Sequence, residues 1–240
     1  MSERWQRWGP VSGLLLCVTW APMAIVIPKL PDLGSAQKVE SYWRENQVLM
    51  QGVILSVSVG FLFLLTFLGA LVELMRSGSG SGAGATCWTA FGGAVMFMTA
   101  LNVALGLDIA GDLIVHADPA STYALHTAAF LLAAPAAFAG AAFFVAVAAF
   151  TWDAGLFPRW TAWIADVGVV ANAGTVLGIV TLTGPLNSGN GLVGGIAAPL
   201  GMFLVWTFVI SVWWIRQAPV FPSSGTRRLP QRSVAAGPAS

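Results

Sequence analysis

Six long apolar segments that carry almost no charge dominate this chain of 240 residues. They cover residues 11–27, 49–75, 85–107, 123–150, 160–183 and 191–215. A helix needs about 20 apolar residues to cross a bilayer, with a lower limit near 17. Charged residues make up only 9% of the chain, whereas a soluble domain has about 25%. The sequence therefore predicts an all-α polytopic transmembrane helix bundle, a single unit over residues 1–216 with about six spans.

The positive charges predict how this bundle is oriented. An even number of spans places both ends of the chain on the same side of the membrane. With an inside N-terminus, eight basic residues fall in inner segments: Arg4, Arg7, Arg76, Arg159, Arg216, Arg227, Arg228 and Arg232. Three fall in outer segments: Lys29, Lys38 and Arg44. Because Lys and Arg concentrate in cytoplasmic loops, the sequence predicts an N-in, C-in topology.

The two ends of the chain carry expectations of their own. Arg and Trp alternate in residues 4–8, ahead of the first span, as in a membrane-interface anchor. A cleaved signal peptide has a similar basic start and apolar core. However, Pro28 follows the apolar run in place of a small-residue cleavage site, so we expect an uncleaved first span. Residues 217–240 are expected to form a disordered cytoplasmic tail, and residues 77–82 a flexible loop.

An outer amphipathic helix is predicted for residues 35–47, in the longest polar insert. Ser35 can cap this helix, because its side-chain oxygen can accept a hydrogen bond from an early backbone N–H. Val39, Tyr42 and Trp43 share one helical face at spacings i, i+3 and i+4. We expect the helix to lie along the membrane surface. There it would either simply cover the bundle or act as a gate over a pocket.

The fourth span, residues 123–150, is the expected centre of the bundle. It is unusually rich in Ala and contains Gly140. Small residues allow helix backbones to approach closely in lipid, where apolar burial gives little drive between helices. Pro135 in this span and Pro199 in the sixth are expected to kink their helices, because proline lacks an N–H and clashes with the preceding turn.

The most polar stretch between spans runs from Leu101 to His126. It holds three of the ten acidic residues and both histidines, and no Lys or Arg. Asp108, Asp112 and His116 are spaced i, i+4 and i+8, which places them on one face if the helix continues. Asp108 and His116 would then be about 12 Å apart along the axis, too far to hold one ion together.

Part of this stretch resembles a metal-ligand set. Asp112 and His116, with His126 or Glu40 as a third ligand, would be chemically reasonable for zinc. The sequence contains no HExxH or similar pattern. We therefore predict no metal site and no cofactor.

Asp118 has a simpler interpretation, because Pro119 follows it. Asp at the cap and Pro at the first helical position is how a helix begins. We expect Asp118 to start the fourth span. His126, farther along this span, is either a buried histidine hydrogen-bonded to a neighbour or a catalytic one.

Asp166 is an acid inside the fifth span, about two turns from Trp160. Acidic residues within the membrane are costly and are functional candidates by default. The alternatives are snorkelling to the inner interface and a hydrogen bond across helices, with Asn102 or Asn172 as partner. The candidate catalytic residues are thus Asp108, Asp112, His116 and Asp166.

Three sequence motifs resemble those of a known group of proteins. The opening RWQRWGPVSGLLL is followed by AQKVESYWRENQ, and FPRWTAWIA precedes the fifth span. Together they resemble a broad group of actinobacterial multi-pass membrane proteins that has no agreed activity. The resemblance implies a small all-helical bundle. Arg outnumbers Lys nine to two, with much Ala and Gly, which suggests a GC-rich bacterial genome. We therefore expect the bacterial plasma membrane.

These features leave three functions open. The first is a non-catalytic accessory or structural bundle. The second is a membrane-embedded enzyme that acts on a lipid or isoprenoid substrate, with Asp108, Asp112 or Asp166 as acid or base. The third is a small-solute or proton-coupled transporter with Asp166 on its path, although the two halves show no inverted repeat. The expected partners are the lipid bilayer and a lipid or isoprenoid ligand. The net charge of +1 gives no reason to expect nucleic acid.

Overall fold

Helices form almost all of the computed structural model, which describes residues 3–78 and 84–217. The α-helices are α1 (Glu3–Val26), α2 (Ala36–Gly78), α3 (Gly84–Ile114), α4 (Pro119–Leu131), α5 (Ala133–Ala154), α6 (Arg159–Val176) and α7 (Ala197–Gln217). Two short 3-10 helices follow α1 and α6: η1 (Ile27–Lys29) and η2 (Leu177–Ile179). The described ranges contain no strand. Six helical segments are long and apolar enough to cross a membrane, with α4 and α5 together forming one of them. The predicted all-α polytopic bundle is confirmed.

Two predicted flexible segments lie mostly outside the described residues. The predicted tail, residues 217–240, has only Gln217 inside them, at the end of α7. The predicted loop, residues 77–82, has only its first two residues inside them, at the end of α2.

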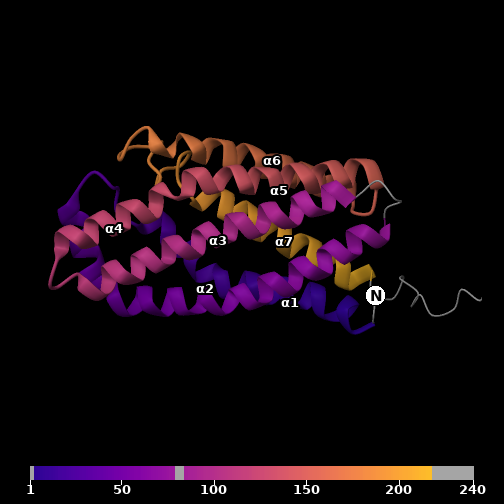
Figure 1. Cartoon of the computed structure of the whole chain (residues 1–240), viewed down its shortest axis with the longest axis horizontal. Helices are drawn as coiled ribbons and strands as arrows, with labels where there is room; N and C mark the ends of the chain where they lie inside the picture. Colours follow the sequence, from indigo (N-terminus) through magenta and orange to yellow (C-terminus); the bar gives the residue numbers. More distant parts are fainter. Residues whose placement is uncertain (1–2, 79–83, 218–240) are drawn as a thin grey trace, which may run out of the picture.

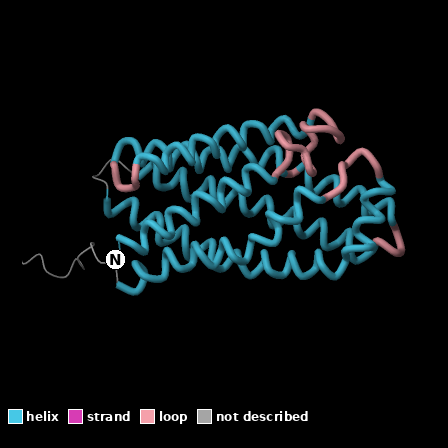
Figure 2. Tube along the Cα trace, turned by 180° about the vertical axis from the view of Figure 1, so that it is seen from behind, coloured by secondary structure: helices cyan, strands magenta, loops and turns pink. Residues whose placement is uncertain are grey.

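The spans form a closed helix ring. Each helix packs on its neighbours along the chain, from α1 on α2 through to α6 on α7, and α7 returns to pack on α1. Figure 1 shows these helices running side by side, with the N-terminus near the end of α7. Figure 2 shows that the longer loops gather at the opposite end of the bundle.

Aromatic side chains fill the middle of the helix ring. Phe143 packs against Phe203 and Trp206, with ring centroids 5.2 and 5.3 Å apart, and Phe97 packs against Phe203 at 6.3 Å. All four side chains are buried. Tilted and edge-to-face contacts of this kind are the favoured arrangements of aromatic pairs. The centre of the bundle is therefore a packed core.

The Ala-rich fourth span is the most enclosed of the six. Of its most apolar stretch 56% is buried, against at most 44% in the other spans. It is a member of the helix ring, with α3 on one side and α6 on the other. Small residues allow this close packing: a Cβ added at Gly93 of α3 would lie 2.7 Å from the backbone of Ala139 and Phe143 in α5.

Helix α2 corrects one prediction. It runs without interruption for 43 residues, about 65 Å at 1.5 Å per residue. The separate helix predicted along the membrane surface, residues 35–47, is wrong, because this segment is the first part of α2. No Pro or Gly occurs between residues 36 and 51 to break the helix. Ser35 does bond the helix start, since its Oγ accepts from the N–H of Lys38 at 3.4 Å.

Both predicted proline positions fall at helix beginnings. The fourth span breaks at Leu132, between α4 and α5, and Pro135 is the third residue of α5. The proline ring would clash with the carbonyl of Leu131 if the helix continued, which explains the break. Pro199 lies in the first turn of α7, where a missing N–H removes no helical hydrogen bond. The sixth span therefore begins at Ala197, later than predicted, and has no kink at this proline.

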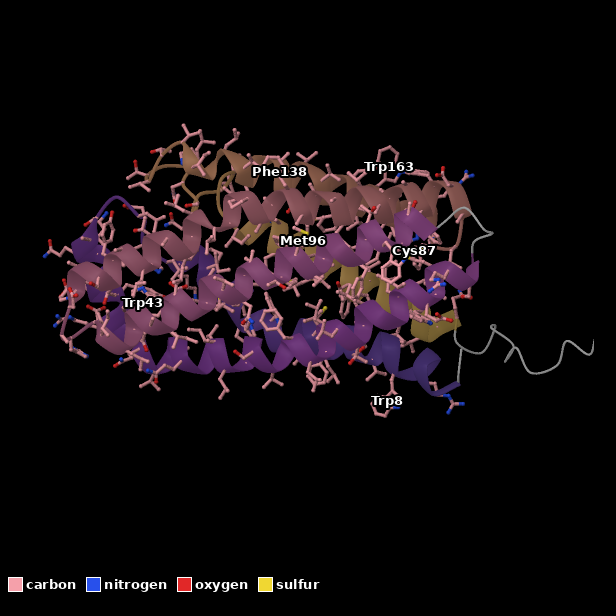
Figure 3. The ribbon with its side chains drawn as sticks, in the orientation of Figure 1. Trp8, Trp43, Cys87, Met96, Phe138 and Trp163 are labelled. Atoms are coloured by element: carbon pink, nitrogen blue, oxygen red, sulfur yellow. The ribbon has the colours of Figure 1, made fainter. Side chains whose placement is uncertain are left out.

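Exposed tryptophans indicate how the bundle sits relative to a bilayer. Exposed indole side chains occur on several helices: Trp8, Trp88, Trp152, Trp160 and Trp163. Figure 3 shows Trp8 and Trp163 on opposite sides of the same end, with Trp43 at the other end. Such a belt is typical of a membrane–water interface. Asp108 follows Trp88 by 20 residues on α3, about 30 Å, which matches the thickness of the hydrocarbon core.

The close approach at Gly93 predicts a difference between two adjacent glycines. Gly93→Ala places a methyl group against the α5 backbone and is expected to destabilise the bundle by about 1–3 kcal/mol. Gly92→Ala, where an added Cβ meets nothing within 4 Å, is expected to be neutral or stabilising by up to about 1 kcal/mol. Unfolding by SDS titration in mixed micelles measures both. Equal effects of the two substitutions would contradict the packing described for α3 and α5.

Candidate functional site

Three helices bring polar side chains together near the end of the bundle opposite the tryptophan belt. We call this group the polar cluster: Trp43, Gln47, Gln51, Asp108, Asp112 and His126. The α2 members are spaced by four residues and so share one face of that long helix. The α3 members are one turn apart, and α4 supplies the histidine. Segments distant in the sequence thus meet at one level of the bundle.

The hairpin between α3 and α4 positions His126. Asp118 caps α4, because its Oδ1 accepts from the N–H of Ser121 at 3.1 Å, and Pro119 is the first helical residue. This confirms the predicted helix start. Thr122 then donates its hydroxyl to the Gly111 carbonyl of α3 at 2.9 Å. His126 lies one turn beyond Thr122 on the same face and so points at α3.

Asp108 and His126 form the central contact of the cluster. Asp108 Oδ1 lies 2.8 Å from His126 Nδ1, and both side chains are buried. Trp43 and Phe130 meet the imidazole edge-on, with ring centroids 5.4 and 4.8 Å away. These aromatic walls exclude water, so the carboxyl and the imidazole depend on each other for hydrogen bonding.

Asp112 connects α3 to the long helix α2. Gln51 donates its Nε2–H to Asp112 Oδ2 at 2.7 Å, and Gln47 donates to the Asp112 backbone carbonyl at 3.1 Å. The Asp112 side chain is 1% exposed. A buried carboxylate requires hydrogen-bond donors, and here the Gln51 amide of α2 provides one, while Gln47 from the same helical face bonds the backbone of the same residue.

Three polar atoms of the cluster are buried without a hydrogen-bond partner among the described residues. They are Asp112 Oδ1, His126 Nε2 and Trp43 Nε1. A buried polar atom left unpaired costs about 1–3 kcal/mol. The cluster holds three of the ten such atoms in the described residues, so it retains unused hydrogen-bonding capacity.

A cavity of about 50 Å³ lies beside Asp108, inside the helix ring. Its walls come from α1, α2, α3, α4, α5 and α7, with η1 and the segment before α7 contributing as well. Representative apolar lining residues are Trp20, Met23, Met50, Leu105, Phe130 and Leu200. Asp108 is the one ionisable residue in the lining that the structure describes. The cavity is therefore an apolar pocket with one carboxyl in its wall.

The structure separates the four candidate catalytic residues. Asp108 and Asp112 lie together in the cluster. His116 is exposed in the turn after α3, because that helix ends at Ile114 and does not continue to place His116 on the Asp112 face. Asp166 is partly exposed on α6, a helix that contributes no residue to the cluster. It forms no hydrogen bond or ion pair within the described ranges. Its proposed partner Asn172 bonds the Gly168 carbonyl instead.

The zinc alternative finds no ligand set in the part of the chain that the structure describes. No three His, Cys, Asp or Glu side chains there are grouped closely enough to hold a metal ion. Glu40, considered as a third ligand, instead forms an ion pair with Arg44 at 2.7 Å.

Two cluster members were missed by the sequence reasoning. Gln47 and Gln51 continue the face of Trp43 at i+4 and i+8, and this spacing was the available signal. It was hidden because residues 35–47 were interpreted as a separate surface helix. The pairing of Asp108 with His126, 18 residues apart, had no signal of local spacing at all.

No protein-family model, curated protein or solved structure matches the chain.

The buried contact predicts strong coupling between Asp108 and His126. Asp108→Ala or His126→Ala leaves one buried polar group unpaired and is expected to destabilise the bundle by about 3–5 kcal/mol. The double variant is expected to lose less than the sum of the two, which a double-mutant cycle measures by SDS titration. His116→Ala is the control, with an expected change within about 0.5 kcal/mol because the side chain is exposed. Additive losses would mean that the two side chains do not interact.

The cap of α4 predicts a pH effect outside the membrane span. Hydrogen bonds from the Ser121 hydroxyl and backbone N–H lower the pKa of Asp118 below its usual range. Because the folded-state pKa is lowered, this stabilisation is complete above the ordinary aspartate pKa near 3.9 and is lost as pH falls through the lowered value. Asp118→Asn, which keeps the cap but cannot ionise, is expected to flatten that acid limb of the Tm–pH curve. An unchanged limb in Asp118→Asn would contradict this assignment.

Proposed function

We propose that this chain is an accessory protein of the bacterial plasma membrane that binds the apolar part of a lipid or isoprenoid molecule in the pocket beside Asp108. The observation that carries the proposal is the composition of the pocket wall. Apolar side chains surround one carboxyl, which is itself hydrogen-bonded to His126. Ligand sites of small molecules have this composition, with mostly apolar walls and few polar groups that fix orientation.

The size of the pocket supports a short apolar group. A water-sized group needs roughly 10–15 Å³ of such a cavity. A cavity of about 50 Å³ therefore accommodates about three to five such groups, close to a single branched isoprenoid unit. An apolar cavity of this kind does not hold ordered water well, so filling it with hydrocarbon is favourable.

The level of the pocket supports entry from the membrane. Asp108 lies about 30 Å from the level of Trp88, near the opposite boundary of the hydrocarbon core. The basic residues Arg7, Arg76, Arg159 and Arg216 belong to the helix ends near the tryptophan belt, which favours that end as cytoplasmic. In this orientation the pocket lies at the level of the outer leaflet.

A second candidate is an enzyme that acts on the same lipid or isoprenoid. The contact between Asp108 and His126 favours it, because a hydrogen-bonded carboxyl and imidazole at a pocket wall can transfer a proton to or from a bound molecule. Transport receives less support, because aromatic side chains fill the centre of the helix ring, where a solute path would run. They are Phe97, Phe143, Phe203 and Trp206.

The proposal predicts opposite results for two adjacent residues of α3. Ala104 lines the pocket, whereas Val103 is 53% exposed on the lipid-facing side. Ala104→Phe is expected to fill the pocket and abolish the rise in Tm that a small isoprenoid alcohol gives the wild-type protein in detergent. At ligand concentrations about 100 times Kd that rise corresponds to about 2.7 kcal/mol.

Val103→Phe is the matched control and is expected to keep the full rise. The measurement is a thermal shift series with prenol, checked by calorimetric titration. Wild-type protein that shows no saturable binding, or equal losses in both variants, would refute the pocket as the ligand site.

A further inference from the structure

We infer that the pocket selects molecules whose polar end is an uncharged or cationic hydrogen-bond donor, an alcohol or an amine, and rejects carboxylate and phosphate ends. This inference rests on the proposed binding function and adds the chemical class of the head group. It is carried by the hydrogen-bonding state of Asp108 and by the charges around it.

Asp108 offers an acceptor to the pocket. Its Oδ1 is engaged with His126 Nδ1 at 2.8 Å, and its Oδ2 makes no hydrogen bond with any described residue. One proton lies in the contact between Oδ1 and Nδ1 whether the pair is ionised or neutral. In both states Oδ2 remains an acceptor, so the ligand group that meets it must donate.

The charges around Asp108 oppose an anion. Asp112 is a second carboxyl one helical turn away, and its Oδ2 accepts from the neutral Gln51 amide. The neighbouring cation, Arg44, is already paired with Glu40 at 2.7 Å and donates to the Val115 carbonyl at 3.4 Å. No Lys or Arg lines the pocket in the described ranges. A bound anion would find no cation in the pocket wall to pair with, and an unpaired charge is costly in a buried, low-dielectric site.

The unpartnered atoms of the cluster provide an independent observation. The buried Trp43 indole carries an N–H without a partner, and its ring meets that of His126 at 5.4 Å. Indole N–H can only donate. The cluster thus contains an unpaired donor beside the Asp108–His126 pair, although Trp43 itself does not line the pocket. At Asp108 a hydroxyl or ammonium group can donate, whereas carboxylate and fully ionised phosphate groups only accept.

A ligand series with one constant apolar part tests the inference. Prenol, prenylamine, prenyl phosphate, the corresponding carboxylic acid and the corresponding alkene share one branched hydrocarbon unit and differ only in the polar end. Binding is measured by calorimetric titration into the full-length protein in a neutral detergent. The alcohol and the amine are expected to bind at least about tenfold more tightly than the acid and the phosphate, because only the first two can donate a hydrogen bond to Asp108 Oδ2.

A pair of variants assigns the selection to one carboxyl. Asp108→Asn removes the charge at nearly constant shape and is expected to reduce the affinity for prenylamine about tenfold and to abolish discrimination against the acid. Asp118→Asn also removes one carboxylate, but at an exposed helix cap, and is expected to leave the series unchanged. If Asp108→Asn fails to fold, the ligand series measured on the wild-type protein alone tests the head-group selection.

The outcomes separate the two levels of the proposal. Equal binding of all five compounds, or tighter binding of the acid or phosphate, overturns the head-group selection and leaves the apolar pocket standing. Selection that persists in Asp108→Asn overturns the role of this carboxyl. Absence of binding by every compound overturns the proposed function itself.

Discussion

The buried contact between Asp108 and His126 is the interaction on which the half of the bundle opposite the tryptophan belt depends. A carboxyl among apolar side chains is tolerated only when it is hydrogen-bonded, and here the partner comes from the next helix. The contact fixes α4 against α3, and the bonds from Gln47 and Gln51 to Asp112 fix α2 against the same helix. Three helices are thus held together at one level by polar groups.

The architecture gives this polar contact its apolar surroundings. The spans pack in a closed helix ring, aromatic side chains fill its middle, and a small pocket remains beside Asp108. In lipid, apolar burial gives little drive for helix association, so small residues and interhelical hydrogen bonds carry specificity. Gly93 provides the close approach of α3 to α5, and the polar cluster provides the hydrogen bonds. The same arrangement leaves Asp108 in the wall of a small apolar pocket.

Much of the fold follows from local sequence signals. The spans, the Asp118 cap and the break near Pro135 each depend on residues a few positions apart, and the structure contains all of them. The prediction for residues 35–47 was wrong because amphipathic periodicity describes one face of a helix and not where the helix ends. No Pro or Gly interrupts residues 36–51, so the helix continued, and Gln51 came to lie on the face of Trp43.

By itself the sequence determined that the chain is a helical membrane bundle, because hydrophobic length and charge depletion are properties of each segment alone. It also determined where the acids and histidines concentrate. Only the tertiary structure decided which of them meet. Asp108 and His126 are 18 residues apart and Gln51 and Asp112 are 61 apart, so their contacts depend on how α2, α3 and α4 pack. His116 is only four residues from Asp112, yet the end of α3 at Ile114 leaves it exposed.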